Sequence, residues 1–174
     1  MVKSYAQFNA FNNFLHKYRY LFITLIFLFA FGVRVWGLDS HSLWFDEGVE
    51  YLIASSNINE LFSNSLLTYR DPPLYLILLH YWMYISQSEF HLRFLSVLMS
   101  MITVSGMILI GIKLEGITTG LIAGLITAIL PSEVRYAQDA GQYAFIGTSL
   151  TISNLLPQKI FLRFSVSVPN CYLW

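Results

Sequence analysis

The stretch FLSVLMSMITVSGMILIGI, residues 94–112, decides the fold class because it carries no charged side chain from end to end. A helix of this length extends about 28 Å at 1.5 Å per residue. The hydrocarbon core of a bilayer is about 30 Å thick. The stretch therefore predicts a membrane-spanning helix that ends at Lys113.

Three further segments predict spans over about residues 20–37, 116–131 and 143–156. The first is apolar from Tyr20 to Val33 and reaches residue 37 if Arg34 snorkels. A secretory signal peptide is the alternative interpretation, but the apolar run is long and no Ala-x-Ala-like cleavage site follows. In the second of these segments, residues 116–131, small residues recur every fourth position, which favours close helix packing. They are Gly116, Gly120, Gly124 and Ala128.

The composition agrees with a membrane environment. Of the 174 residues, 56% are hydrophobic and only 11% are charged, and the mean hydropathy is +0.57. Soluble domains carry about 25% charged residues. We therefore predict an all-α, polytopic membrane helical bundle with the lipid bilayer as its solvent. The net charge of zero gives no reason to expect a nucleic-acid partner.

The loop after the first span is acidic. Between residues 39 and 71 it contains one base, Arg70, and the acids Asp39, Asp46, Glu47, Glu50, Glu60 and Asp71. Bases cluster instead before the first span, at Lys3, Lys17 and Arg19. The positive-inside rule therefore predicts a cytoplasmic N-terminus and an extracytoplasmic acidic loop.

Two interfacial helices are expected in this loop. Over residues 45–55, Phe45, Val49, Leu52 and Ile53 form an apolar stripe, with the acids on the other face. A second helix, residues 73–86, starts at the Asp71-Pro72-Pro73 break, is too short to cross a bilayer and is rich in Tyr and Trp. If this helix does not cross the membrane, the span at 94–112 leads inward and the span at 116–131 leads outward again. The loop at residues 132–142 then also lies on the outer side.

The sequence Ser42-Leu43-Trp44-Phe45-Asp46-Glu47-Gly48 is the first candidate for chemistry. One interpretation is a helix N-terminus in which Ser42 caps and the acids complement the helix dipole. The other is a carboxylate that acts as a general base, with a pKa raised by burial against Trp44 and Phe45.

Asp139 is the second candidate acid, in a segment that could equally be an ordinary polar loop. On the predicted topology it faces the same side as Asp46. The two are candidate ligands of a divalent metal, although the sequence shows no diagnostic ligand spacing. Arg70 and Arg93 are candidate phosphate-binding residues, with a Glu89 pair as the alternative role for Arg93. His80 is a further candidate functional residue, for which packing on an apolar helix is the alternative interpretation.

Four short motifs in order resemble the GT-C superfamily of glycosyltransferases. The similarity is to bacterial relatives of protein O-mannosyltransferases and of the aminoarabinose transferase that modifies lipid A, and it covers roughly residues 15–150. The motifs are Trp44-Phe45-Asp46-Glu47-Gly48; Asp71-Pro72-Pro73-Leu74-Tyr75 with Leu78-Leu79-His80; Ser88-Glu89-Phe90 with Leu92-Arg93; and Tyr136-Ala137-Gln138-Asp139-Ala140 with Tyr143-Ala144.

The resemblance implies a polyprenyl-phosphate-linked sugar as donor and inverting transfer to an acceptor hydroxyl outside the bacterial plasma (inner) membrane. Asp46 would be the general base, supported by Glu47, and Asp139 would help to organise the site. Substrate-binding roles would fall on Arg70, Asp71, Pro73, Tyr75, His80, Arg93, Gln138 and Tyr143. The acceptor is not specified, and no cofactor is implied beyond an optional divalent metal.

The chain departs from the family in two respects. Gly141 stands where the family commonly has an arginine, and residues 157–174 do not continue an apolar run. We therefore expect residues 1–156 to form the family's N-terminal module and the tail to be atypical, from a truncated or frameshifted end. A non-catalytic membrane fragment or a lipid-binding assembly partner is the alternative. A transporter is disfavoured because the acids lie at span ends and not near the bilayer midplane.

Overall fold

The computed structural model describes residues 14–63 and 73–156, and these are helical with no β-strand. The all-α prediction is confirmed for this part of the chain. The helices are α2 (Arg19–Val35), α3 (Phe45–Ser55), α4 (Ile58–Ser63), α5 (Pro73–Trp82), α6 (Glu89–Glu115), α7 (Ile117–Ile129), α8 (Pro131–Gln138) and α9 (Gln142–Leu155).

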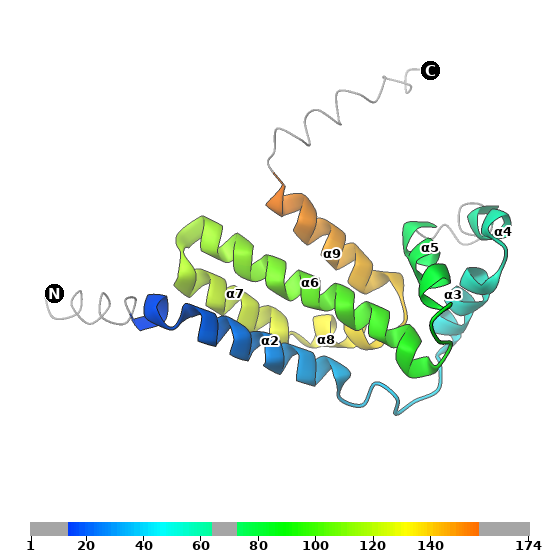
Figure 1. Ribbon diagram of the computed structural model, residues 1–174, viewed down its shortest axis with the longest axis horizontal. Coiled ribbons are helices and arrows are strands. Elements are labelled where there is room, and N and C mark those ends of the chain that lie inside the picture. Colours follow the sequence, from blue (N-terminus) through cyan, green and yellow to red (C-terminus); the bar gives the residue numbers. More distant parts are fainter. Residues whose placement is uncertain (1–13, 64–72, 157–174) are drawn as a thin grey trace, which may run out of the picture.

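The long helices run lengthwise and the loop helices gather at one end (Figure 1). Helices α2, α6 and α7 lie side by side, with α9 along another side of α6. Helices α3, α4 and α5 lie beyond the end of α2, near the start of α6. Ser88 caps α6 by accepting from the His91 amide at 3.3 Å, and the Trp82 indole donates to the His91 carbonyl at 2.8 Å. These contacts fix α5 to the first turn of α6.

One described helix, α6, is by itself long and apolar enough to cross a membrane. Helices α7 and α8 pass together as one bent pair with a 57° break, so at most two crossings follow from length and composition. The other expected spans correspond to α2, with 17 residues, and α9, with 14. Membrane association is therefore supported by α6, while the four-span topology stays a prediction.

The small-residue stripe of α7 packs against α6, as predicted. A Cβ added to Gly120 would lie 2.7 Å from the Ile108 carbonyl oxygen, and one added to Gly124 would clash with the Ile108 side chain. On the α6 side, the matching position is Gly111, whose added Cβ would lie 2.7 Å from the Gly120 Cα. Gly116, with φ +97°, joins the two helices in a conformation that few other residues adopt.

Arg34 corrects one expectation, because it does not snorkel. Its side chain is fully buried and turned into the bundle. The guanidinium donates to Ser100 Oγ at 2.8 Å and to the carbonyls of Thr127 and Ala128 at 3.0 and 3.1 Å. Those carbonyls end α7, where unpaired acceptors and the negative end of the helix dipole attract a cation.

Three other elements differ from expectation. Residues 131–138, expected as part of a loop, form α8, with Pro131 at its first position, where a missing N–H costs nothing. Helix α4 was not predicted, and the helix expected over 73–86 ends at Trp82. The atypical tail lies outside the described residues.

Candidate functional site

Glu47 is the central residue of the site, and its side chain caps the N-terminus of its own helix, α3. Its Oε2 accepts from the amide of Trp44, the N-cap residue of α3, at 2.9 Å. The expected cap, Ser42, does not serve this role; its carbonyl accepts from Arg93 at 3.1 Å. The acids in the first turn do lie where a helix dipole favours them, as the simpler interpretation expected.

Arg93, near the start of α6, uses all five of its N–H groups. Nε and Nη2 bind the two oxygens of Glu47 at 2.9 and 2.8 Å. The remaining donors bind the carbonyls of Leu38, His41 and Ser42 at 2.9, 2.7 and 3.1 Å. Arg93 is 4% exposed, so the loop between α2 and α3 closes around it. Among the described residues its ion pair is with Glu47, at 2.8 Å, and not with the alternative partner Glu89.

The Glu47 carboxylate is equally well paired. In addition to Arg93 and Trp44, its Oε1 accepts from the Ala140 amide at 2.6 Å. Burial alone would raise the pKa of Glu47, but the hydrogen bonds from Arg93, Ala140 and Trp44 outweigh it and hold the pKa below its usual value. Glu47 is therefore a fixed anion that joins α3, α6 and the turn between α8 and α9.

Asp139 lies next to this junction, and its pKa is shifted in the opposite direction to that of Glu47. It is half-buried at the end of α8. Burial, and next the negative charge of Glu47, raise the pKa of Asp139 above its ordinary value, against the lowering effect of Arg135 and Arg93. A carboxyl group with a raised pKa can exchange a proton more easily near neutral pH.

Asp46 and Asp139 line the same pocket, of about 300 Å³, which we call the acidic pocket. Its walls are Trp44, Asp46, Glu47, Glu50, Arg135, Asp139, Ala140, Gly141 and Tyr143. Asp46 is exposed, and so are Trp44 and Phe45, so these aromatic side chains do not bury it as expected. The carboxylates that α3 turns inward are Glu47 and Glu50, while Leu52 and Phe45 of its apolar stripe face outward.

A second pocket, of about 420 Å³, adjoins the first, because Trp44 and Asp139 line both. We call it the tryptophan pocket. Its walls are Val33, Trp36, Gly37, Leu38, Ser40, His41, Trp44, Arg93, Gln138 and Asp139. It lies between the end of α2 and the end of α8.

The remaining predicted substrate-binding residues do not lie together in one pocket. Tyr143 lines the acidic pocket and stacks on Tyr136 with ring centroids 4.9 Å apart. Gln138 instead donates to the last carbonyls of α2, most closely to Trp36 at 3.0 Å. Tyr75 is 1% exposed and packs against Phe145, so it reaches neither pocket.

His80 and Pro73 also lie away from the acidic pocket. His80 lines a third pocket of about 270 Å³ with Ala54, Ser55, Met83, Tyr84 and Gln87. Its Nδ1 donates to the Ala54 carbonyl at 2.6 Å, which ties α5 to α3 in the packing role considered above. Pro73 begins α5. Arg70 and Asp71 lie outside the described residues.

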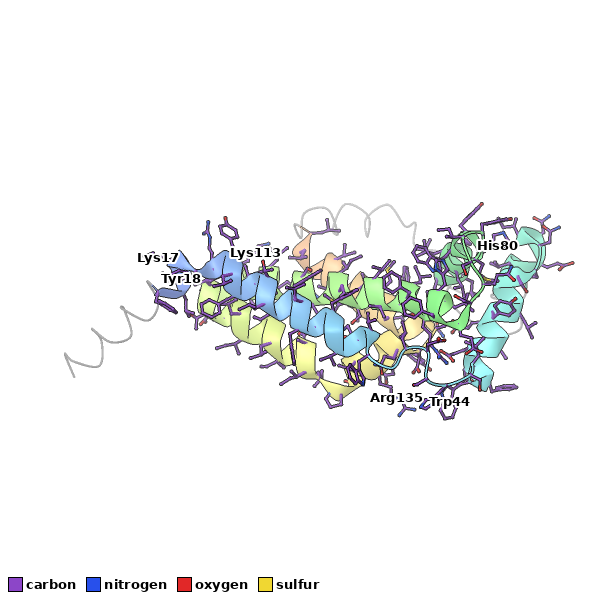
Figure 2. The ribbon with its side chains drawn as sticks, turned by 60° about the horizontal axis from the view of Figure 1, so that its bottom comes forward. Lys17, Tyr18, Trp44, His80, Lys113 and Arg135 are labelled. Carbon is purple, nitrogen blue, oxygen red and sulfur yellow. The ribbon has the colours of Figure 1, made fainter. Side chains whose placement is uncertain are left out.

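Sequence analysis missed Arg135 and undervalued Glu50. Arg135 is exposed on α8 and is the basic side chain that lines the acidic pocket. Figure 2 shows it near Trp44, at the end of the molecule opposite Lys17 and Lys113. Its position four residues before Asp139 in the sequence was the available signal. Glu50 was recognised only as a polar-face residue, but it is 8% exposed in the pocket wall.

A metal site is not favoured by the described side chains. Within residues 14–63 and 73–156, no group of three or more His, Cys, Asp or Glu residues is arranged to hold an ion. Asp46 and Asp139 share a pocket wall with Glu47 and Glu50, but no three of these described acids form such a group. The optional metal therefore remains without support in this part of the chain.

Comparisons with protein families, with curated proteins and with solved structures find no match to this chain.

Proposed function

We propose that this protein belongs to the GT-C type of membrane glycosyltransferases. It would transfer a sugar from a polyprenyl-phosphate donor to an acceptor hydroxyl in the acidic pocket. The observation that carries the proposal is that two acids from distant segments, Asp46 and Asp139, line one pocket. Figure 1 shows that α3 and α8, the helices beside these residues, lie toward the end of the molecule where α2 ends and α6 begins. A polyprenyl chain needs lipid and its phosphate needs the polar interface, and a pocket at the end of a membrane bundle would meet both needs.

The positions of the charges support a topology with this pocket outside. In Figure 2, Lys17 and Lys113 lie at one end of the molecule, and Trp44 and Arg135 lie at the other. The positive-inside rule would place the lysine end in the cytoplasm. In this arrangement α2, α6, α7 with α8, and α9 form the proposed polytopic bundle of the plasma membrane, and α3 and α5 lie at its outer surface.

Asp46 is the proposed general base. It would take the proton of the acceptor hydroxyl as that oxygen bonds to the anomeric carbon, with inversion. The bond from the anomeric carbon to the phosphate oxygen breaks, and its electron pair leaves with the polyprenyl phosphate. The Glu47 carboxylate is held by hydrogen bonds from Arg93, Trp44 and Ala140. These bonds would fix the first turn of α3 and so the position of Asp46, the preceding residue.

Arg135 is the proposed partner of the donor phosphate. A phosphate that loses its sugar gains negative charge, and a guanidinium beside it would stabilise that charge. Arg93 is less suited to this role than the sequence indicated, because its five donors are occupied. Asp139 would orient a hydroxyl of one of the two substrates.

The test is sugar transfer by the purified full chain in proteoliposomes. Radiolabelled polyprenyl-phosphate mannose and polyprenyl-phosphate glucose are supplied with a mixed extract of bacterial envelope acceptors. We expect label to leave the polyprenyl fraction with the wild type and with Asp39→Asn, and to stay there with Asp46→Asn. Asp39 is the matched control, an exposed carboxylate of the same loop that lines neither pocket.

Equal transfer by Asp46→Asn and Asp39→Asn would contradict the assigned base. Absence of transfer by the wild type, with normal membrane insertion, would favour the alternative of a non-catalytic lipid-binding protein.

A further inference from the structure

The tryptophan pocket combines exposed aromatic surface with polar groups. Trp36 is 84% exposed and Trp44 is 65% exposed, although indoles contribute most to stability when they are buried. Asp139 and His41 line the same pocket. Two large aromatic faces beside a carboxylate and an imidazole are suited to a ligand with both apolar and hydroxyl-bearing surfaces.

The walls of this pocket are held by short hydrogen bonds. The Trp36 amide donates to the Gly32 carbonyl at 3.0 Å, and the following turn has Gly37 at φ +74°. Ser40 closes the turn through its amide and Oγ, which donate to the Gly37 carbonyl at 3.0 and 2.6 Å. Arg93 fixes the loop that follows. A preformed pocket loses little conformational entropy when a ligand binds.

The charges of the lining select the ligand class. Arg93 is the basic residue of the lining, and its N–H groups are already used by Glu47 and three carbonyls. Asp139 repels anions, and Arg135, which would offset this repulsion in the acidic pocket, does not line the tryptophan pocket, so a phosphate or carboxylate ligand is disfavoured here. A purely apolar ligand would leave the Asp139 carboxylate desolvated and without a partner. A neutral ring with a C–H face and a rim of hydroxyls meets both conditions.

The position of the pocket gives this ligand a role. Trp44 and Asp139 form the boundary with the acidic pocket, where the donor sugar is proposed to lie. We infer that the tryptophan pocket binds a carbohydrate ring, and that the acceptor of the proposed transfer is therefore a glycan hydroxyl and not a peptide side chain. The assignment of the acceptor rests on the proposed function.

The test uses the full chain in lipid nanodiscs, labelled with 5-fluorotryptophan, and fluorine NMR. Probes are methyl α-mannopyranoside, methyl α-glucopyranoside and a threonine-containing peptide. We expect at least one glycoside to shift the Trp36 and Trp44 resonances and leave Trp82 unchanged, because Trp82 stacks on His91 at 4.6 Å and lines neither pocket. Trp36→Ala should weaken glycoside binding about fivefold, as expected for loss of one aromatic face. Tyr81→Ala, an exposed aromatic on α5, is the matched control.

Three results would overturn the inference: the peptide alone shifts Trp36, no glycoside shifts it, or Trp36 responds only to the lipid composition as an interfacial anchor. Binding of radiolabelled polyprenyl-phosphate mannose is measured in parallel, and Trp36→Ala should retain it. Glycoside shifts without donor binding would support the carbohydrate pocket and contradict the proposed function, so the two failures are distinguishable.

Discussion

The buried pair of Glu47 and Arg93 gives the sharpest stability prediction. Both side chains are 4% exposed and they share two hydrogen bonds of 2.8 and 2.9 Å. Removing one member leaves the other charge buried and uncompensated, which costs about 3–5 kcal/mol. Glu47→Gln and Arg93→Met should each lower the free energy of unfolding by about this amount.

The double variant should cost less than the sum of the two single variants, because it leaves no uncompensated buried charge. It loses the donors to the three loop carbonyls and one of the two bonds from the Trp44 and Ala140 amides, since Gln keeps one acceptor oxygen. At about 1 kcal/mol each this is about 4 kcal/mol, against about 6–10 kcal/mol for the sum. The assay is thermal unfolding in detergent micelles, followed by circular dichroism. Glu60→Gln, an exposed acid on α4, is the control and should change stability by about 0.5 kcal/mol or less. Additive single costs, or single costs near that of the control, would refute the assigned pairing.

Three further predictions use the same unfolding assay. Gly120→Ala should destabilise by about 1–3 kcal/mol because its Cβ meets the Ile108 carbonyl, whereas Gly32→Ala, with open space around it, should be neutral or stabilising; equal effects would contradict the α6–α7 packing. Arg34→Met should cost about 3 kcal/mol through the unpaired carbonyls at the end of α7, and a neutral result would contradict its capping role. Asp139→Asn should raise stability at neutral pH, because a raised folded-state pKa means that the ionised form is disfavoured by folding; a loss of stability would reverse that assignment.

The contributions of Glu47 and Asp139 to the stability of the folded protein should depend on pH with opposite signs. The pKa of Glu47 is depressed in the folded protein, so its contribution is present above its unfolded pKa of about 4.3 and is lost as the pH falls through the lower folded value. The pKa of Asp139 is raised, so stability from this group declines as the pH rises from its unfolded value of about 3.9 through the folded one.

Periodicity and segment length predicted most of the fold. The apolar run at residues 94–112 lies within α6, the helix predicted over 45–55 coincides with α3, and the glycine stripe packs as expected. These features are local, since a side chain's spacing along its own helix decides them. The α8 helix was missed because its polar composition resembles a loop, although Pro131 marked its start.

Long-range partners could not be predicted in the same way. Arg34 carries a charge that suggested snorkelling, but the end of α7 lies beside it and provides carbonyl acceptors. Gln138 suggested substrate binding, yet the end of α2 takes its amide. The sequence placed Asp46 and Asp139 on the same side, but the Glu47 contact with the Ala140 amide, which brings their segments together, depends on the tertiary fold.

Photocrosslinking tests most directly the proposed position of the donor sugar in the acidic pocket. A polyprenyl-phosphate sugar with a diazirine on the sugar ring is irradiated with the full chain in nanodiscs, and labelled peptides are mapped by mass spectrometry. We predict labelling within residues 44–50 and 135–143, and its loss when unmodified donor competes. Competed labelling confined to the third pocket, around His80 and Tyr84, would contradict the claim.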